Sequence, residues 1–149
     1  MQKFEDLISK DKYQVFIFCC PTYLPFNYFR HPWFVLNKKG KISRWEIRHD
    51  LNKLNSSHLY INNQMPFEGI EKTFFSNRYW KSDILGCIDG IAAERAIEMI
   101  ESSKDNYPYI KKYSYFGPNS NTYLQWVLSK LPEFNITLSY RFIGKDFHV

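Results

Sequence analysis

The segment PWFVLNKKGKISRWEIRH, residues 32–49, decides the fold. Its first part, Pro32 to Leu36, is apolar, and Asn37 to Gly40 has the composition of a turn. The last part, Lys41 to His49, alternates between polar and apolar side chains. Two strand-like runs on either side of a short turn that contains glycine predict an antiparallel β-hairpin.

The second arm of this hairpin has two distinct faces, because successive side chains of a strand point to opposite sides. One face carries Ser43, Trp45, Ile47 and His49, and the other carries Arg44, Glu46 and Arg48. We therefore expect His49 in or near the core. The basic residues of this region are expected to form a solvated hairpin tip: Lys38, Lys39, Lys41, Arg44 and Arg48.

The remaining elements follow from periodicity and capping signals. Strands are predicted at Tyr13–Cys20, Ser57–Asn62 and Asp83–Cys87, and a final strand at residues 136–147. One helix is predicted from about Ile91 to Ser102, with Asp89 as its N-cap, and a second from Asn119 or Ser120 to Leu131. This order predicts an α+β fold, a mostly antiparallel sheet with helices packed on it, in a single domain over residues 1–149.

Composition narrows the class of protein. The 149 residues are 44% hydrophobic and 19% aromatic, enough for a folded core. The net charge of +5 is mild and scattered, so nucleic-acid binding is the weakest of the hypotheses. The three cysteines form neither a disulfide framework nor a zinc motif, and no segment has the length of a membrane span. We expect a cytoplasmic protein without metal or cofactor.

Three short motifs carry a family resemblance. They are Tyr107-Pro108-Tyr109, the heptapeptide GPNSNTY at residues 117–123, and IGKD at residues 143–146. With His31-Pro32-Trp33-Phe34 and Trp45-Glu46-Ile47, they resemble an uncharacterised bacterial family, domain-of-unknown-function family 3750. The matches run from His31 to Phe147. The resemblance implies a shared fold and assigns no activity.

A more distant resemblance concerns chemistry. The segment Asn119-Ser120-Asn121 is similar in position to the Asn-Cys motif that opens a helix in circularly permuted papain-like domains, the NlpC-like group. Ser120 stands where that group has its cysteine nucleophile, which makes a hydrolase or acyl-transferase relic one hypothesis. In it Ser120 attacks a carbonyl, the helix N-terminus stabilises the oxyanion, and His31 accepts the proton, oriented by His49 or Asp50.

The competing hypothesis is a non-catalytic binding module on the same fold. A thiol is far more nucleophilic than an unassisted hydroxyl, and Asn and Ser are also the preferred residues at helix starts. In this interpretation the cleft between the second helix and the hairpin binds a small molecule or a peptide. The candidate binding residues are Asn119, Asn121, Trp33, Lys145 and Asp146.

Overall fold

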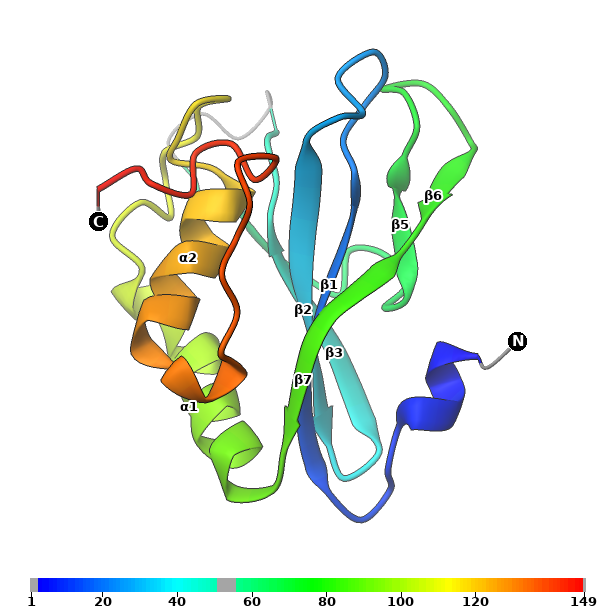
Figure 1. The fold of residues 1–149 in the computed structure, drawn as a ribbon, viewed down its shortest axis with the longest axis vertical. Coiled ribbons are helices and arrows are strands. Elements are labelled where there is room, and N and C mark those ends of the chain that lie inside the picture. The colour runs from blue at the N-terminus through cyan, green and yellow to red at the C-terminus, as the bar shows by residue number, and fades with distance from the viewer. Residues whose placement is uncertain (1–2, 51–55, 149) are drawn as a thin grey trace.

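Five antiparallel strands form the central sheet in the order β4-β3-β2-β1-β7 (Figure 1). The computed structural model describes residues 3–50 and 56–148. The strands are β1 (Tyr13–Pro21), β2 (Arg30–Lys38), β3 (Lys41–Ile47), β4 (Leu59–Ile61) and β7 (Asp83–Asp89). The predicted hairpin is therefore confirmed, and it forms the β2–β3 pair with Phe34 opposite Trp45.

Two unlike layers cover this sheet. Both helices, α1 (Gly90–Asn106) and α2 (Ser120–Lys130), pack on one face (Figure 1). The other face carries a small antiparallel pair, β5 (Glu68–Glu71) with β6 (Tyr79–Lys81), and the short 3-10 helix η1 (Phe4–Leu7). The α+β class and the mostly antiparallel sheet are as predicted, whereas the β5–β6 layer was not predicted.

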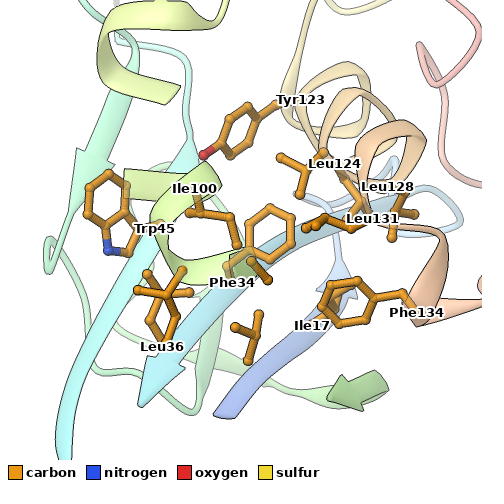
Figure 2. Close-up of a cluster of buried hydrophobic side chains, with 14 of the residues drawn as sticks. Ile17, Phe34, Leu36, Trp45, Ile100, Tyr123, Leu124, Leu128, Leu131 and Phe134 are labelled. Atoms are coloured by element: carbon orange, nitrogen blue, oxygen red, sulfur yellow. The ribbon is translucent and has the colours of Figure 1, made fainter. Parts of the chain in front are cut away.

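Strand β1 contributes to both cores because its side chains alternate. Val15, Ile17 and Cys19 face the helices, while Phe16 and Phe18 face the β5–β6 layer. Figure 2 shows Phe34 of the sheet close to Leu124 of α2, and Ile17 beside Phe134. The rings of Phe34 and Tyr123 meet edge to face at 5.8 Å. The central strands are thus apolar on both faces, which is why the run from Tyr13 to Cys20 contains almost no polar residue.

The predicted final strand does not form. After a single 3-10 turn, η2 (Pro132–Phe134), residues 135–139 run without strand structure. Leu138 is buried in the helix-side core and Ile136 packs against it. A Cβ on Gly86 would lie 2.6 Å from Ile136 Cδ1, so the tail crosses β7 closely there. The alternation in the sequence reflects this packing and not a ladder of backbone hydrogen bonds.

Two further expectations need correction. Asp89 precedes α1, but its side chain makes no capping hydrogen bond and instead lies 3.7 Å from Lys12 Nζ. Arg44 is not solvated: it is 1% exposed beneath the β5–β6 layer. Within the described part of the chain, no helix combines the length and the apolar character needed to cross a bilayer.

Candidate functional site

Asn119 organises the start of α2. Its side-chain Oδ1 accepts hydrogen bonds from the backbone N–H groups of Asn121 and Thr122, at 2.9 and 3.2 Å. The hydroxyl of Thr122 in return accepts a bond from the Asn119 N–H at 3.0 Å. This is a complete capping box, so two of the N–H groups that could hold an oxyanion, those of Asn121 and Thr122, are already engaged.

The same residues fasten the C-terminal tail to the helix. Asn119 Nδ2 and Asn121 Nδ2 both donate to the carbonyl of Ile143, each at 2.9 Å. Thr122 Oγ1 donates to the carbonyl of Gly144 at 2.7 Å, and Asn121 Nδ2 also reaches the carbonyl of Arg30 at 3.2 Å. The NSNT and IGKD motifs are therefore two halves of one structural contact, which we call the latch.

Ser120 lies in the first turn of α2 and is 6% exposed. No hydrogen bond connects its hydroxyl to His31 or His49, all three of which are described residues. His31 is paired with Cys20 across the β1–β2 ladder and lies at 6.1 Å, ring to ring, from Trp33. Both partners belong to the face opposite the helices. The structure thus does not bring the predicted nucleophile and base together.

His31 belongs instead to a buried group of charged side chains under the β5–β6 layer. Glu46 accepts a hydrogen bond from Arg44 Nε at 2.7 Å, and its carboxylate oxygens lie 3.7 Å from His31 Nε2 and from Arg48 Nε. Arg48 extends the group with a 3.0 Å bond to Glu71. These five residues, His31, Arg44, Glu46, Arg48 and Glu71, form what we call the buried charge cluster.

The ionisation of this cluster follows from its surroundings. Burial lowers the pKa of His31, so the imidazole is neutral at pH 7. Burial opposes the ionisation of Glu46, but His31, Arg44 and Arg48 together outweigh it and lower its pKa to about 2. Arg44 also donates to the carbonyls of Met65 and Glu68. The cluster is a charged interior that ties β3 to the chain leading into β5.

Trp33 is part of the same environment and is 1% exposed. The guanidinium of Arg44 lies 4.1 Å from the centre of its ring, a cation–π contact. Its indole N–H donates to the carbonyl of Pro66 at 2.8 Å. These contacts account for Trp33 as an interior residue, and no surface is left for a ligand.

His49 lies at the mouth of a smaller cavity of about 390 Å³. The side chain is exposed, which corrects the expectation that it enters the core. Its ring is 4.9 Å from that of Tyr113 and 6.2 Å from that of His58. Partial burial and the neighbouring His58 lower its pKa. Asp50 lines the same cavity and accepts a 2.5 Å hydrogen bond from Tyr60. This contact differs from the predicted one, in which Asp50 orients His31.

The larger cavity, of about 810 Å³, lies along the C-terminal tail, and we call it the tail groove. Its lining includes Ile143 and Gly144, the two residues whose carbonyls the latch binds. Five aromatic residues line it: Tyr109, Phe116, Tyr140, Phe142 and Phe147. Lys145 and Asp146 line it as well, and Lys145 Nζ donates to both carboxylate oxygens of Asp146 at 2.8 Å.

The predicted binding residues therefore divide into three groups. Lys145 and Asp146 line the tail groove, Asn119 and Asn121 bind the carbonyl of Ile143, which also lines it, and Trp33 is buried elsewhere. Sequence reasoning missed the aromatic lining. The available signal was the density of aromatic residues in YPYIKKYSYF, residues 107–116. Within residues 3–50 and 56–148, no three His, Cys, Asp or Glu side chains are arranged to hold a metal ion.

Comparison with known proteins gives one match. The sequence model of a family described as "Protein of unknown function (DUF3750)" matches residues 12–147. No curated protein and no solved structure matches the chain.

Proposed function

The chain belongs to the DUF3750 family, and we propose that it is a non-catalytic binding domain whose ligand occupies the tail groove. The observation that carries this proposal is the groove itself, an aromatic-lined hollow of about 810 Å³ with one ion pair among its lining residues. Small-molecule sites in proteins typically have volumes of roughly 300–1,000 Å³ and are mostly apolar, with a few polar groups that orient the ligand.

The lining supports a ligand with a flat or apolar part. Phe116 and Tyr140 are 77% and 76% exposed, so their rings are available for stacking without any change in the core. Tyr109 and Phe147 meet edge to face at 5.3 Å, which gives the groove a fixed wall. An aromatic side chain of a peptide and a planar small molecule both fit this chemistry.

The polar part of the groove supports a ligand that also carries charge. Lys145 is 22% exposed and its ammonium is held by Asp146, whose carboxylate is 83% exposed. An incoming anionic group competes with that carboxylate for the ammonium at little cost, because exposed ion pairs contribute less than about 1 kcal/mol. We therefore propose a ligand that combines an aromatic or apolar group with an anionic one.

The competing function is the acyl-transfer chemistry of Ser120. It would need a base near the hydroxyl and free N–H donors at the helix start. The capping box occupies two of those donors, and His31 lies among the residues of the opposite sheet face. These contacts favour binding over catalysis. The papain-like outline on which the catalytic hypothesis rested stays a prediction.

Fluorescence titration with 1-anilinonaphthalene-8-sulfonate, an aromatic anion, tests the proposal. We expect saturable binding to the folded protein that weakens several-fold in a Phe116→Ala, Tyr140→Ala double variant. Ile91→Ala is the matched control, because Ile91 is 77% exposed at the start of α1, outside the groove. Ser120→Ala should bind the probe like the wild type. Hydrolysis of p-nitrophenyl acetate that disappears in Ser120→Ala would overturn the proposal in favour of catalysis.

A further inference from the structure

Two loops that are distant in sequence lie side by side at one end of the molecule (Figure 1). One is the β1–β2 connection, residues 22–29, and the other is the β5–β6 connection, residues 72–78. The backbone N–H of Leu24 donates to the carbonyl of Lys72 at 2.8 Å, and the rings of Tyr23 and Phe74 stack at 4.3 Å. The loops therefore form one continuous surface.

The tips of these loops expose large apolar side chains. Phe75 is fully exposed, Phe26 and Phe74 are 66% and 65% exposed, and Leu24 is 45% exposed. Single exposed apolar residues are common on protein surfaces, but four on adjoining tips make a patch of the kind that marks an interaction site. We call Leu24, Phe26, Phe74 and Phe75 the tip patch.

The charges around the tip patch have one sign. The charged residues of the two loops, residues 22–29 and 72–78, are Lys72 and Arg78, with no Asp or Glu. Glu71, the acidic residue next to the second loop, is already paired with Arg48 at 3.0 Å. The patch therefore adjoins two cations whose charge is not cancelled within these loops.

In the β5–β6 loop the cations and the aromatic rings occupy different levels. The N–H of Lys72 donates to the carbonyl of Arg78 at 2.8 Å, which closes the base of the loop, whereas Phe74 and Phe75 lie at its turn. Apolar rings thus project furthest and cations lie behind them. A membrane interface has the same layering, because the acyl region lies beneath a layer of phosphates.

We propose that the tip patch docks the domain onto an anionic phospholipid surface. The four apolar side chains enter the boundary of the acyl region, and Lys72 and Arg78 contact lipid phosphates. This is a peripheral attachment, in which apolar insertion and attraction to anionic lipids contribute together. Single-stranded nucleic acid also combines bases with phosphates, but it binds along grooves in which rings stack with bases, and these rings stand on protruding tips.

Co-sedimentation with vesicles tests the proposal. The probes are phosphatidylcholine vesicles with and without about 30 mol % phosphatidylglycerol, an anionic lipid. We expect the wild-type protein to sediment with the anionic vesicles only, and the bound fraction to fall as salt is raised from about 50 to 500 mM. A Phe75→Trp variant should in addition show a blue shift of its fluorescence when anionic vesicles are added.

Matched variants distinguish binding through the tip patch from nonspecific adsorption to vesicles. Phe26→Ser with Phe75→Ser should weaken vesicle binding at least about tenfold, since each ring removes insertion area. Ile91→Ser removes an equally exposed apolar side chain at the start of α1 and should have no effect. Arg78→Glu should weaken binding about tenfold, whereas Lys41→Glu, at the exposed start of β3, changes the net charge equally and should not.

Three results would overturn the proposal. The first is a folded wild-type protein that does not sediment with anionic vesicles at low salt. The second is an equal loss of binding in the tip variants and in their controls. The third is tight, salt-sensitive binding of a single-stranded oligonucleotide together with no binding to vesicles. That result would assign the patch to nucleic acid instead.

Discussion

Gly144 lies against the side chain of Asn119 with no room for another carbon atom. A Cβ on Gly144 would lie 2.5 Å from Asn119 Nδ2 and 2.8 Å from its Oδ1. Gly144 also has a φ of +90°, in the region that side chains other than glycine avoid. The two motifs of the latch therefore depend on each other. The Asn119 side chain fits only against a residue without a Cβ, and Gly144 supplies the carbonyl that Thr122 binds.

Replacing Gly144 by alanine should destabilise the protein by about 2–4 kcal/mol, through backbone strain and the clash with Asn119. Gly90→Ala is the matched control. Gly90 has a φ of +69° and nothing within 4 Å of its would-be Cβ, so only the strain of about 1 kcal/mol remains. Urea unfolding followed by tryptophan fluorescence measures both variants. Equal losses would show that the Asn119 contact adds nothing.

Removing the carboxylate of Glu46 should lower the free energy of unfolding more than most single substitutions. Glu46→Ala leaves Arg44 charged and 1% exposed without its ion-pair partner, at a cost of about 3–5 kcal/mol. Lys38→Ala breaks the more exposed Lys38–Glu101 pair and should cost less than about 1 kcal/mol. Calorimetric unfolding compares the two. A loss below 1 kcal/mol for Glu46→Ala would mean that the cluster contributes no more than a surface pair.

Stability should fall in acid in two stages. The pKa of His31 in the folded state lies below its ordinary 6.5, so its contribution is complete above pH 6.5 and is lost as the pH falls below that value. The pKa of Glu46 is lowered from 4.5 to about 2, so its contribution is lost between those values. The free energy of unfolding, measured from pH 8 down to about pH 2, reports both stages.

Variants identify the group that titrates in the first stage, the fall in the free energy of unfolding below pH 6.5. His31→Asn should reduce this pH dependence, because the buried imidazole no longer takes up a proton on unfolding. His49 has a lowered pKa too and leaves a smaller slope. His148→Asn, at an exposed position, is the control and should follow the wild type. An unchanged profile in His31→Asn would show that His31 is not the group that titrates.

Thiol reactivity should distinguish the three cysteines. Burial raises the pKa of Cys19 to about 11 and that of Cys20 to about 12, and both side chains are buried. Ellman's reagent at pH 8 should therefore modify only Cys87 in the native protein, slowly, because its pKa is also raised to about 11. Cys87→Ser should not react until urea is added. Fast native reaction in that variant would contradict the burial of Cys19 and Cys20.

The parts of the fold with strong periodicity were predictable. The run Tyr13–Cys20 and the stripe of apolar residues in α2 each indicate their element without outside information. The β5–β6 pair was not predictable, because its strands have four and three residues and no clear alternation. Because that layer was not predicted, Arg44 was expected in solvent, whereas the β5–β6 layer covers its face of β3.

The candidate site was predictable only in part. The motifs singled out residues 119–122 and 143–146, and the structure joins Asn119, Asn121 and Thr122 to the carbonyls of Ile143 and Gly144; their role in binding stays a prediction. Sequence spacing could not show that their polar groups are used on one another. It also could not show that Ser120 lies in the helix layer on one face of the sheet while His31 belongs to the opposite face. That arrangement depends on which face of the sheet the helices cover.

The attachment of the β5–β6 hairpin has a mechanical consequence. Arg44 of β3 donates to the backbone carbonyls of Met65, which precedes β5, and of Glu68, the first residue of β5, while Arg48 binds the side chain of Glu71, its last residue. The β5–β6 hairpin is therefore anchored to the sheet by side chains at both ends of β5. Strand β3 pairs with β2, and the carbonyl of Arg30, the first residue of β2, accepts a hydrogen bond from Asn121 at the start of α2, so a continuous series of contacts joins the hairpin to α2.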